Sequence, residues 1–222
     1  MSDLPADLAR RFDVVDSEVQ LGDATFAVLR PRDAEALISE ADFARDERLP
    51  YWADVWPSSI ALGTRLLEEC GGGRRLLELG CGVGVVALAA ARAGFDVTVS
   101  DYYDDALAFA RANLARAGHA ARARHLDWRA LPDDLPTYDV VVASDVLYER
   151  PYAELVVDVL ARALEPAGVA LVADPGRLAA PAFVQAAKAG GFAVDASDVR
   201  PVRVGQIRQR ITIFALRRAM SA

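Results

Sequence analysis

Cysteine, histidine and long apolar runs are all scarce in this 222-residue chain. Two cysteines and two histidines are too few for a disulfide framework or for a cluster of metal ligands. No apolar run approaches the roughly 20 residues that a membrane-spanning helix needs. The first residues carry Asp3 and Asp7, where a signal peptide would have an apolar segment. We therefore expect a cytoplasmic protein with no bound metal and no membrane association.

Basic residues are also fewer than acidic ones. The 25 Lys and Arg residues against 32 Asp and Glu residues give a formal net charge of −7, which repels a phosphate backbone and disfavours a nucleic-acid substrate. Apolar residues, by contrast, make up 53% of the chain, which is ample for the core of one α/β domain. Several arginines near the C-terminus form either a solvated face or a surface for an acidic protein partner: Arg200, Arg203, Arg208, Arg210, Arg217 and Arg218.

The stretch of residues 74–89 organises the chain. An apolar run ends there in a glycine-rich loop that opens directly into an alanine-rich helical pattern, which predicts strand, tight loop and helix. Gly80, Gly82 and Gly84 permit positive φ and carry no Cβ, so the backbone can approach a ligand where the next helix offers unpaired N–H groups. The dinucleotide fingerprint G-x-G-x-x-G needs a glycine where Val85 stands, so the match to that motif is incomplete.

Residues 95–101 predict a second strand that ends in a carboxylate. Asp101 lies about twenty residues past the glycine loop, where a parallel βαβ unit brings it to the same sheet edge. A carboxylate in that place can accept both ribose hydroxyls of a nucleotide-like cofactor, or it can simply cap the helix that starts near Asp104. Cys81 has no histidine in sequence context to activate it, which favours packing in the loop over a nucleophilic role.

Further strands and helices alternate along the rest of the chain. Strands are predicted over residues 121–126, 138–144 and 168–173, and the second of these is continuously apolar, as a buried parallel strand should be. Alternating runs around a Gly-Asp turn predict a β-hairpin over residues 14–29, followed by a short helix from Asp33. The remaining predicted segments are helices over residues 60–69, 106–117, 151–164 and 181–189 and extended runs over residues 192–199 and 210–216.

Three motifs resemble those of a known family. Glu78-x-Gly80-x-Gly82-x-Gly84 is similar to motif I of class I S-adenosylmethionine (SAM) methyltransferases. Trp56-Pro57 before it, and Asp145-x-x-Tyr148 after the predicted strand 138–144, resemble the methyltransferase-like protein-lysine methyltransferase group. This group includes bacterial electron-transfer-flavoprotein β-subunit lysine methyltransferase-like proteins.

The resemblance implies an α/β fold with a Rossmann-like, seven-stranded, mostly parallel sheet and a reversed C-terminal hairpin. The methyltransferase domain would span residues 50–222, with residues 1–49 as an N-terminal hairpin and helix extension. Trp128 would stack on the adenine, although it could equally cover the edge of the core. The cofactor-binding residues that the resemblance and the glycine loop together indicate are Trp56, Glu78, Gly80, Cys81, Gly82, Asp101, Trp128 and Ser144.

The resemblance further implies that Asp145 and Tyr148 are catalytic, orienting an amine and passing its proton outward. The alternative is that Asp145 caps the next segment and Tyr148 packs. We predict a SAM-dependent N-methyltransferase that acts on lysine of a protein and releases S-adenosylhomocysteine. A small-molecule N-methyltransferase of the pyridine or amine type and a catalytically silent SAM-binding scaffold are the alternatives.

Overall fold

The computed structural model describes residues 5–38 and 49–219 and contains a two-stranded and a seven-stranded sheet. The strands are β1 (Val14–Leu21), β2 (Ala24–Pro31), β3 (Arg75–Leu79), β4 (Asp96–Asp101), β5 (Arg122–His125), β6 (Tyr138–Ser144), β7 (Leu164–Asp174), β8 (Phe192–Val204) and β9 (Ile207–Arg218). The helices are α1 (Ala6–Arg11), α3 (Pro57–Leu67), α4 (Val85–Arg92), α5 (Asp104–Arg116), α6 (Arg150–Ala163) and α7 (Ala180–Ala189), with 3₁₀ turns η1 (Glu35–Leu37) and η2 (Tyr51–Ala53).

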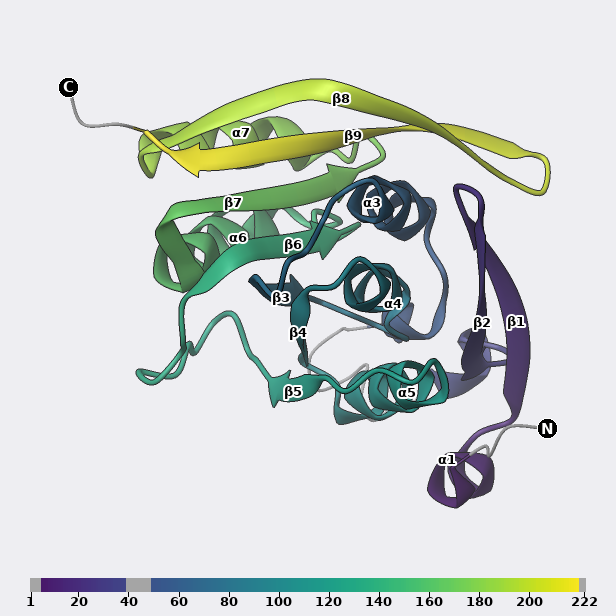
Figure 1. The fold of residues 1–222 in the computed structure, drawn as a ribbon. Coiled ribbons are helices and arrows are strands. Elements are labelled where there is room, and N and C mark those ends of the chain that lie inside the picture. Colours follow the sequence, from purple (N-terminus) through teal and green to yellow (C-terminus); the bar gives the residue numbers. More distant parts are fainter. Residues whose placement is uncertain (1–4, 39–48, 220–222) are drawn as a thin grey trace.

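The large sheet has the strand order β5-β4-β3-β6-β7-β9-β8. All neighbours from β5 to β7 are parallel, and β9 alone runs against both of its neighbours. Helices α3, α4 and α5 cover one face and α6 and α7 the other (Figure 1). This arrangement confirms the predicted seven-stranded, mostly parallel fold. Strands β4 and β6 lie on opposite sides of β3, so the strand order reverses at β3. A ligand crevice is expected at the carboxyl ends of these strands, because ligands of open α/β sheets bind where the strand order reverses.

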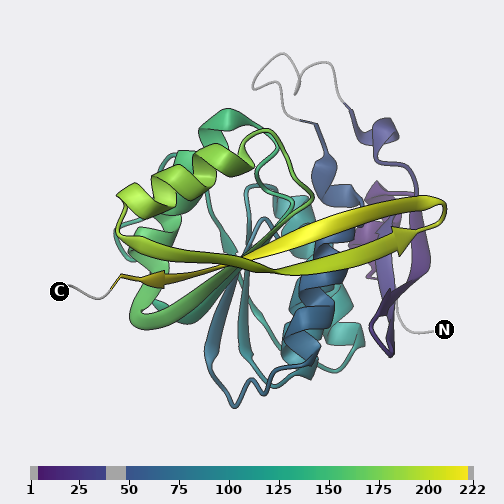
Figure 2. The same cartoon turned by 90° about the horizontal axis from the view of Figure 1, so that it is seen from above.

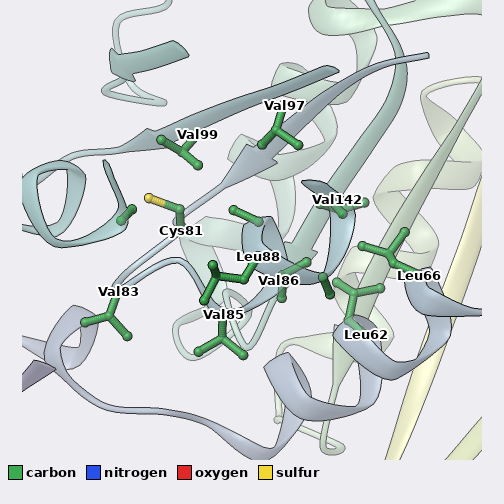
Figure 3. Packing of buried hydrophobic residues seen from close by; sticks show 14 of the residues in the cluster. Leu62, Leu66, Cys81, Val83, Val85, Val86, Leu88, Val97, Val99 and Val142 are labelled. Carbon is green, nitrogen blue, oxygen red and sulfur yellow. The ribbon is translucent and has the colours of Figure 1, made fainter. Parts of the chain in front are cut away.

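The core consists of two hydrophobic clusters, one on each face of the sheet. Figure 3 shows part of the first cluster, in which Cys81 and Val83 of the glycine loop lie among side chains of α3, α4, β4 and β6. The second cluster joins β6 and β7 to α6 and α7. Strand β6 contributes to both clusters, since Val140 and Val142 face the first and Val141 and Ala143 the second. This two-sided burial is why its sequence is apolar at consecutive positions.

The predicted N-terminal hairpin is confirmed as β1 and β2, and its apolar side chains join the first cluster. Asn113 of α5 ties it to the glycine loop: its side chain accepts the Leu29 N–H at 2.7 Å and donates to the carbonyls of Leu29 at 2.9 Å and Val83 at 2.8 Å. Of the helix predicted from Asp33, the structure shows only the short turn η1. Residues 39–48 lie outside the described part of the chain.

The C-terminal hairpin is longer than the sequence predicted. Strand β7 pairs with β9 only as far as Asp174 and Thr212, whereas β8 and β9 stay paired to Val204 and Ile207. The hairpin therefore extends beyond the carboxyl end of β7 as an arm (Figure 2). Arg200 anchors the arm to α3 through two hydrogen bonds to Glu68, at 2.6 and 2.8 Å. Among the described helices, none is long and apolar enough to cross a membrane.

Candidate active site

A pocket opens at the carboxyl ends of the parallel strands, at the switch point beside β3. Its empty volume, including the part open to solvent, is about 940 Å³. The lining comes from the segment before α3 and from the loops that follow β3, β4, β5 and β6. These five segments lie far apart in the sequence and meet because the strands end at one edge of the sheet. A pocket of this size in this place is typical of a site for a nucleotide-like ligand.

The glycine loop forms the floor of the pocket. Gly80 and Gly82 have φ of 62° and 50°, in the left-handed region that favours glycine. A Cβ at Gly82 would lie 2.8 Å from the carbonyl oxygen of Trp52, so the loop and the segment before α3 are in close contact there. A Cβ at Gly80 would lie 3.3 Å from the Val146 side chain and 3.7 Å from that of Trp128. Side chains at these two positions would therefore compete with a bound ligand and with the pocket wall for the same space.

Asp101 lies opposite the loop, at the end of β4. Its carboxylate accepts the backbone N–H of Gly82 at 3.0 Å and that of Tyr103 at 3.0 Å. Burial raises the pKa of Asp101 above its ordinary value, while the hydrogen bonds from Tyr103 and Gly82 pull the pKa back down. The residue is 6% exposed and lines the pocket. Asp101 thus braces the glycine loop and presents an acceptor group to the pocket, and its side chain does not cap α5.

Cys81 also lines the pocket, with its backbone N–H donating to the carbonyl of Ser100 at 3.0 Å. Burial, with the nearby carboxyls of Asp101 and Glu78, raises the pKa of the Cys81 thiol well above its usual value. A thiol in this state is a poor nucleophile, which agrees with the packing role that the sequence favoured.

Glu78 differs in its surroundings from the other predicted cofactor-binding residues. It is 1% exposed and is absent from the pocket lining, while its carboxylate accepts a hydrogen bond from the backbone of Ala87 in the first turn of α4. Its Oε2 has no hydrogen-bond partner within residues 5–38 and 49–219, and burial raises the pKa of this carboxyl well above its usual range. In the structure Glu78 therefore supports the glycine loop and the start of α4, and its assignment to cofactor binding stays a prediction.

Five aromatic side chains form a continuous wall along the pocket, which we call the aromatic wall. Ring contacts run from Trp56 to Tyr51 (5.9 Å between centroids), on to Tyr148 (5.4 Å), to Tyr152 (4.7 Å) and to Trp128 (5.8 Å). All five residues line the pocket. The Trp56 ring is fixed further, since its Nε1–H donates to the carbonyl of Tyr51 at 2.9 Å. The wall thus joins the segment before α3 to the loops after β5 and β6.

The hydroxyl of Tyr148 is held in its neutral form. Desolvation raises the pKa of Tyr148 far above its ordinary value, and a hydrogen bond with Tyr152 raises it further. The residue as a whole is still 38% exposed, and it lines the pocket. Tyr148 can therefore orient a neighbouring group through its hydroxyl or its ring, but it is not poised to act as a phenolate base.

Asp145 follows β6 in a strained conformation. Its φ of 60° is the one positive value outside glycine among the described residues, and its side chain is 4% exposed. Both carboxylate oxygens already accept hydrogen bonds: Oδ1 from Arg177 at 2.6 and 2.8 Å, and Oδ2 from the Ser58 hydroxyl at 2.9 Å. The charge of Asp145 is therefore balanced within the protein before any substrate arrives.

Nine of the ten site residues predicted from the sequence line this one pocket, and Glu78 is the exception. Sequence reasoning missed Arg177, Ser58 and Tyr152. Arg177 lies shortly after the predicted strand 168–173, which ends at the same sheet edge, and this position was a usable signal. Ser58 and Tyr152 carried no signal, because their positions beside Asp145 and Tyr148 follow from tertiary packing.

Comparison with known proteins finds methyltransferases of more than one kind, among them the ubiquinone biosynthesis O-methyltransferase of Bordetella avium, which is 34% identical over 102 residues covering 43% of this chain and 40% of that protein. A family model described as lysine methyltransferase matches residues 46–186. The electron transfer flavoprotein beta subunit lysine methyltransferase of Danio rerio is 30% identical over 131 residues, which cover 58% of this chain and 51% of that protein. The protein-lysine methyltransferase METTL21E of Bos taurus is 30% identical over 118 residues, covering 47% and 40%.

Solved structures share the fold. The ribosomal protein L11 methylase from Lactobacillus delbrueckii subsp. bulgaricus superposes with a TM-score of 0.54 at 23% identity, covering 72% of this chain and 77% of that one. At this level of identity, the likeness shows the fold alone. The chain spans about half the length of the curated relatives that it matches.

Proposed function

This chain belongs to the lysine methyltransferase family, and we propose on that premise that it transfers a methyl group from SAM to the ε-amine of a lysine in a protein. One observation carries the proposal: the glycine loop and Asp101 share a single pocket with the aromatic wall. The loop and Asp101 suit the cofactor. The tyrosines of the wall, Tyr51, Tyr148 and Tyr152, suit the apolar stem of a lysine, which packs well over aromatic faces.

The residues of the pocket fit SAM by their chemistry. Asp101 offers a carboxylate for the two ribose hydroxyls, and Trp128 offers a ring for the adenine. Gly80 and Gly82 leave room that a Cβ would fill, so a ligand can lie against their backbone. Trp56, Cys81 and Ser144 complete the proposed set of cofactor contacts, with S-adenosylhomocysteine as the product.

When bound, SAM supplies a methyl group already activated by its sulfonium. The chain must then align a neutral amine and exclude water. A lysine amine has a pKa of about 10.4 in model peptides, so most of it carries a proton at neutral pH. The aromatic wall removes water from the amine, and desolvation favours its neutral form. Tyr148 keeps its own proton and orients the amine, and Asp145, already paired with Arg177, shapes the acceptor side.

The same proposal covers the organisation of the chain. Residues 50–222 form the methyltransferase domain and residues 1–49 an N-terminal extension. The hydrogen bonds of Asn113 to Leu29 and Val83 support treating the extension as a layer of the same body. A cytoplasmic location belongs to the proposal as well, and it agrees with the two unpaired cysteines.

Incubation of the purified protein with methyl-labelled SAM and a proteome extract tests the function. We expect label in protein, and mass spectrometry should find it as Nε-methyl-lysine. The Asp101→Ala variant and extract without enzyme serve as controls. Label confined to the small-molecule fraction would favour the alternative of a pyridine or amine N-methyltransferase. Calorimetric binding of SAM without any transfer would favour the silent scaffold.

A further inference from the structure

Arg177 connects the acceptor side of the pocket with Trp56, a proposed cofactor contact. It lies in the turn after β7, and its Nε and Nη2 donate to Asp145 Oδ1 at 2.8 and 2.6 Å. Its guanidinium also lies 5.6 Å from the centroid of the Trp56 ring, within the range of a cation–π contact. One side chain thus contacts both Asp145 after β6 and Trp56 before α3.

The turn that carries Arg177 is itself held in place. Asp174 Oδ1 accepts the backbone N–H groups of Gly176 and Arg177, each at 2.7 Å. Asp174 is 1% exposed, and Gly176 has a φ of 94°, which a residue with a side chain rarely adopts. The direction in which Arg177 leaves the turn is therefore set by local backbone geometry.

Ser58 completes the cluster from the other side. Its hydroxyl donates to Asp145 Oδ2 at 2.9 Å from the first turn of α3, two residues after Trp56. Asp145 also donates its own backbone N–H to the carbonyl of Ala173 in β7, at 2.9 Å. These bonds hold Asp145 in its strained conformation, and a cluster so fully bonded resists rearrangement.

We propose that Arg177 is a positioning residue of the acceptor site, which fixes Asp145 and Trp56 and neutralises the Asp145 carboxylate so that the site does not stabilise the protonated acceptor amine. The proposal rests on the proposed function. An unpaired carboxylate beside the amine would favour ammonium, the form that cannot attack a methyl group. The ion pair of Arg177 and Asp145 removes that disadvantage while keeping the carboxylate in place.

Other charged and titratable groups face this region, and none is altered in the proposed variants. They come from every segment around the pocket: Tyr51 and Asp54 before α3, Cys81 after β3, Asp101 at the end of β4 with Tyr102 and Tyr103 after it, Asp127 and Arg129 after β5, Tyr148 after β6, Tyr152 in α6, and Asp174 at the end of β7. Because they stay constant, a change in pH dependence on replacing Arg177 reports the loss of its charge beside Asp145.

The test is the dependence of kcat on pH between 7 and 10, with a labelled-methyl assay on the protein substrate found in the extract. For Arg177→Gln we expect the rising limb of the profile to move to higher pH by about one unit, because the unpaired Asp145 now holds the proton on the amine. Arg177→Lys should keep the wild-type limb at a lower kcat, since it keeps the charge but loses the two-point contact. Arg177→Gln combined with Asp145→Asn should return the limb to its wild-type position.

Arg200→Gln is the matched control, because Arg200 pairs with Glu68 on the arm and is absent from the pocket lining. It should leave the profile unchanged. A drop in kcat by the same factor at every pH in Arg177→Gln would show a merely structural role, and an unchanged profile would show no role. Either result overturns the proposal. Should Arg177→Gln fail to fold, a shifted limb in Arg177→Lys would overturn it as well.

A second readout separates this proposal from the proposed function. The NMR signal of the Trp56 indole N–H, assigned with Trp56→Phe, should move in Arg177→Gln and stay in place in Arg200→Gln, because only the first variant loses the guanidinium over the Trp56 ring. This measurement needs no substrate. A wild type that transfers no methyl group would contradict the proposed function alone, whereas an unmoved Trp56 signal in Arg177→Gln would contradict the role of Arg177 alone.

Discussion

The two halves of the pocket are built differently. On the cofactor side, backbone groups do most of the bonding: the N–H groups of Cys81 and Gly82 bond to Ser100 and Asp101 of the neighbouring strand. On the acceptor side, side chains bond to side chains across three segments, as in the cluster of Ser58, Asp145 and Arg177. The first half depends on loop geometry and the second on the identity of individual residues.

This difference has a functional consequence. The proposed cofactor side is formed largely by backbone groups and would bind SAM, which is the same in every reaction cycle. Few substitutions change its backbone hydrogen bonds, other than those at the glycines and Asp101. The proposed acceptor side is formed by side chains, so each substitution in it changes the site, because the loss of one hydrogen-bond partner leaves the other unpaired. We therefore expect cofactor-side changes to alter SAM affinity and acceptor-side changes to alter turnover. The following experiments test that separation.

The largest effect is expected for Tyr148→Ala on the acceptor side. Removing the ring breaks the aromatic wall between Tyr51 and Tyr152 and opens the pocket to water. Poorer alignment and desolvation of the amine should lower kcat on the order of 10²-fold while SAM affinity stays nearly constant. Tyr148→Phe is the control: it keeps the ring, and since the hydroxyl is not a base, kcat should fall by less than about 10-fold. Equal losses in both variants would contradict this interpretation of the wall.

On the cofactor side, Asp101→Ala should weaken SAM binding by about 1.5 to 3 kcal/mol, the usual scale for hydrogen bonds to a charged group. It removes the acceptor for ribose and also the brace on Gly82. Calorimetry measures the loss. Asp96→Ala, at the exposed start of the same strand, is the control and should bind SAM normally. Unchanged affinity in Asp101→Ala would assign Asp101 a purely structural role.

A smaller effect is expected for Gly82→Ala, and the chain offers a matched control in Gly118→Ala. Both glycines have positive φ, so alanine costs about 1–2 kcal/mol of strain at either position. A Cβ at Gly118 meets nothing within 4 Å, whereas at Gly82 it meets the Trp52 carbonyl at 2.8 Å. Only Gly82→Ala should therefore reduce SAM affinity, by roughly 10-fold for a distortion of that size. Similar affinities in the two variants would show that the close contact does not matter to the ligand.

The smallest effect concerns pH and stability, through Glu78. Its pKa in the folded protein is raised above the ordinary 4.5, so the folded state binds this proton more tightly than the unfolded state does. The associated stability is fully present below about pH 4.5 and is lost as pH rises through the raised value. Glu78→Gln cannot titrate and should show a shallower fall in Tm between pH 5 and 8, by about 3–5 °C for each tenfold difference in proton affinity between the folded and unfolded states. Parallel Tm curves for the variant and the wild type would contradict the raised pKa.

Most of the fold, and the meeting of the predicted cofactor-binding residues in one pocket, could be predicted from the sequence. The glycine loop, the strand ends and Asp101 follow one another within about thirty residues. Parallel strands bring their carboxyl ends to one edge, so sequence order predicts their meeting in space. The burial of Glu78 outside the pocket lining could not be predicted, because a side chain at a strand end can point to the pocket or to the adjacent helix, and periodicity does not distinguish these directions.

The arrangement of the proposed acceptor side and the length of the C-terminal arm depend on tertiary packing and could not be predicted from the sequence. Ser58, Asp145 and Arg177 come from three distant segments, and their bonds depend on how α3 and the turn after β7 pack against β6. The length of β8 and β9 likewise depends on contacts of the arm with α3, including the bond of Arg200 to Glu68. Local patterns specify backbone conformation over a few residues, whereas the pairing of buried charges is set by contacts between segments remote in sequence.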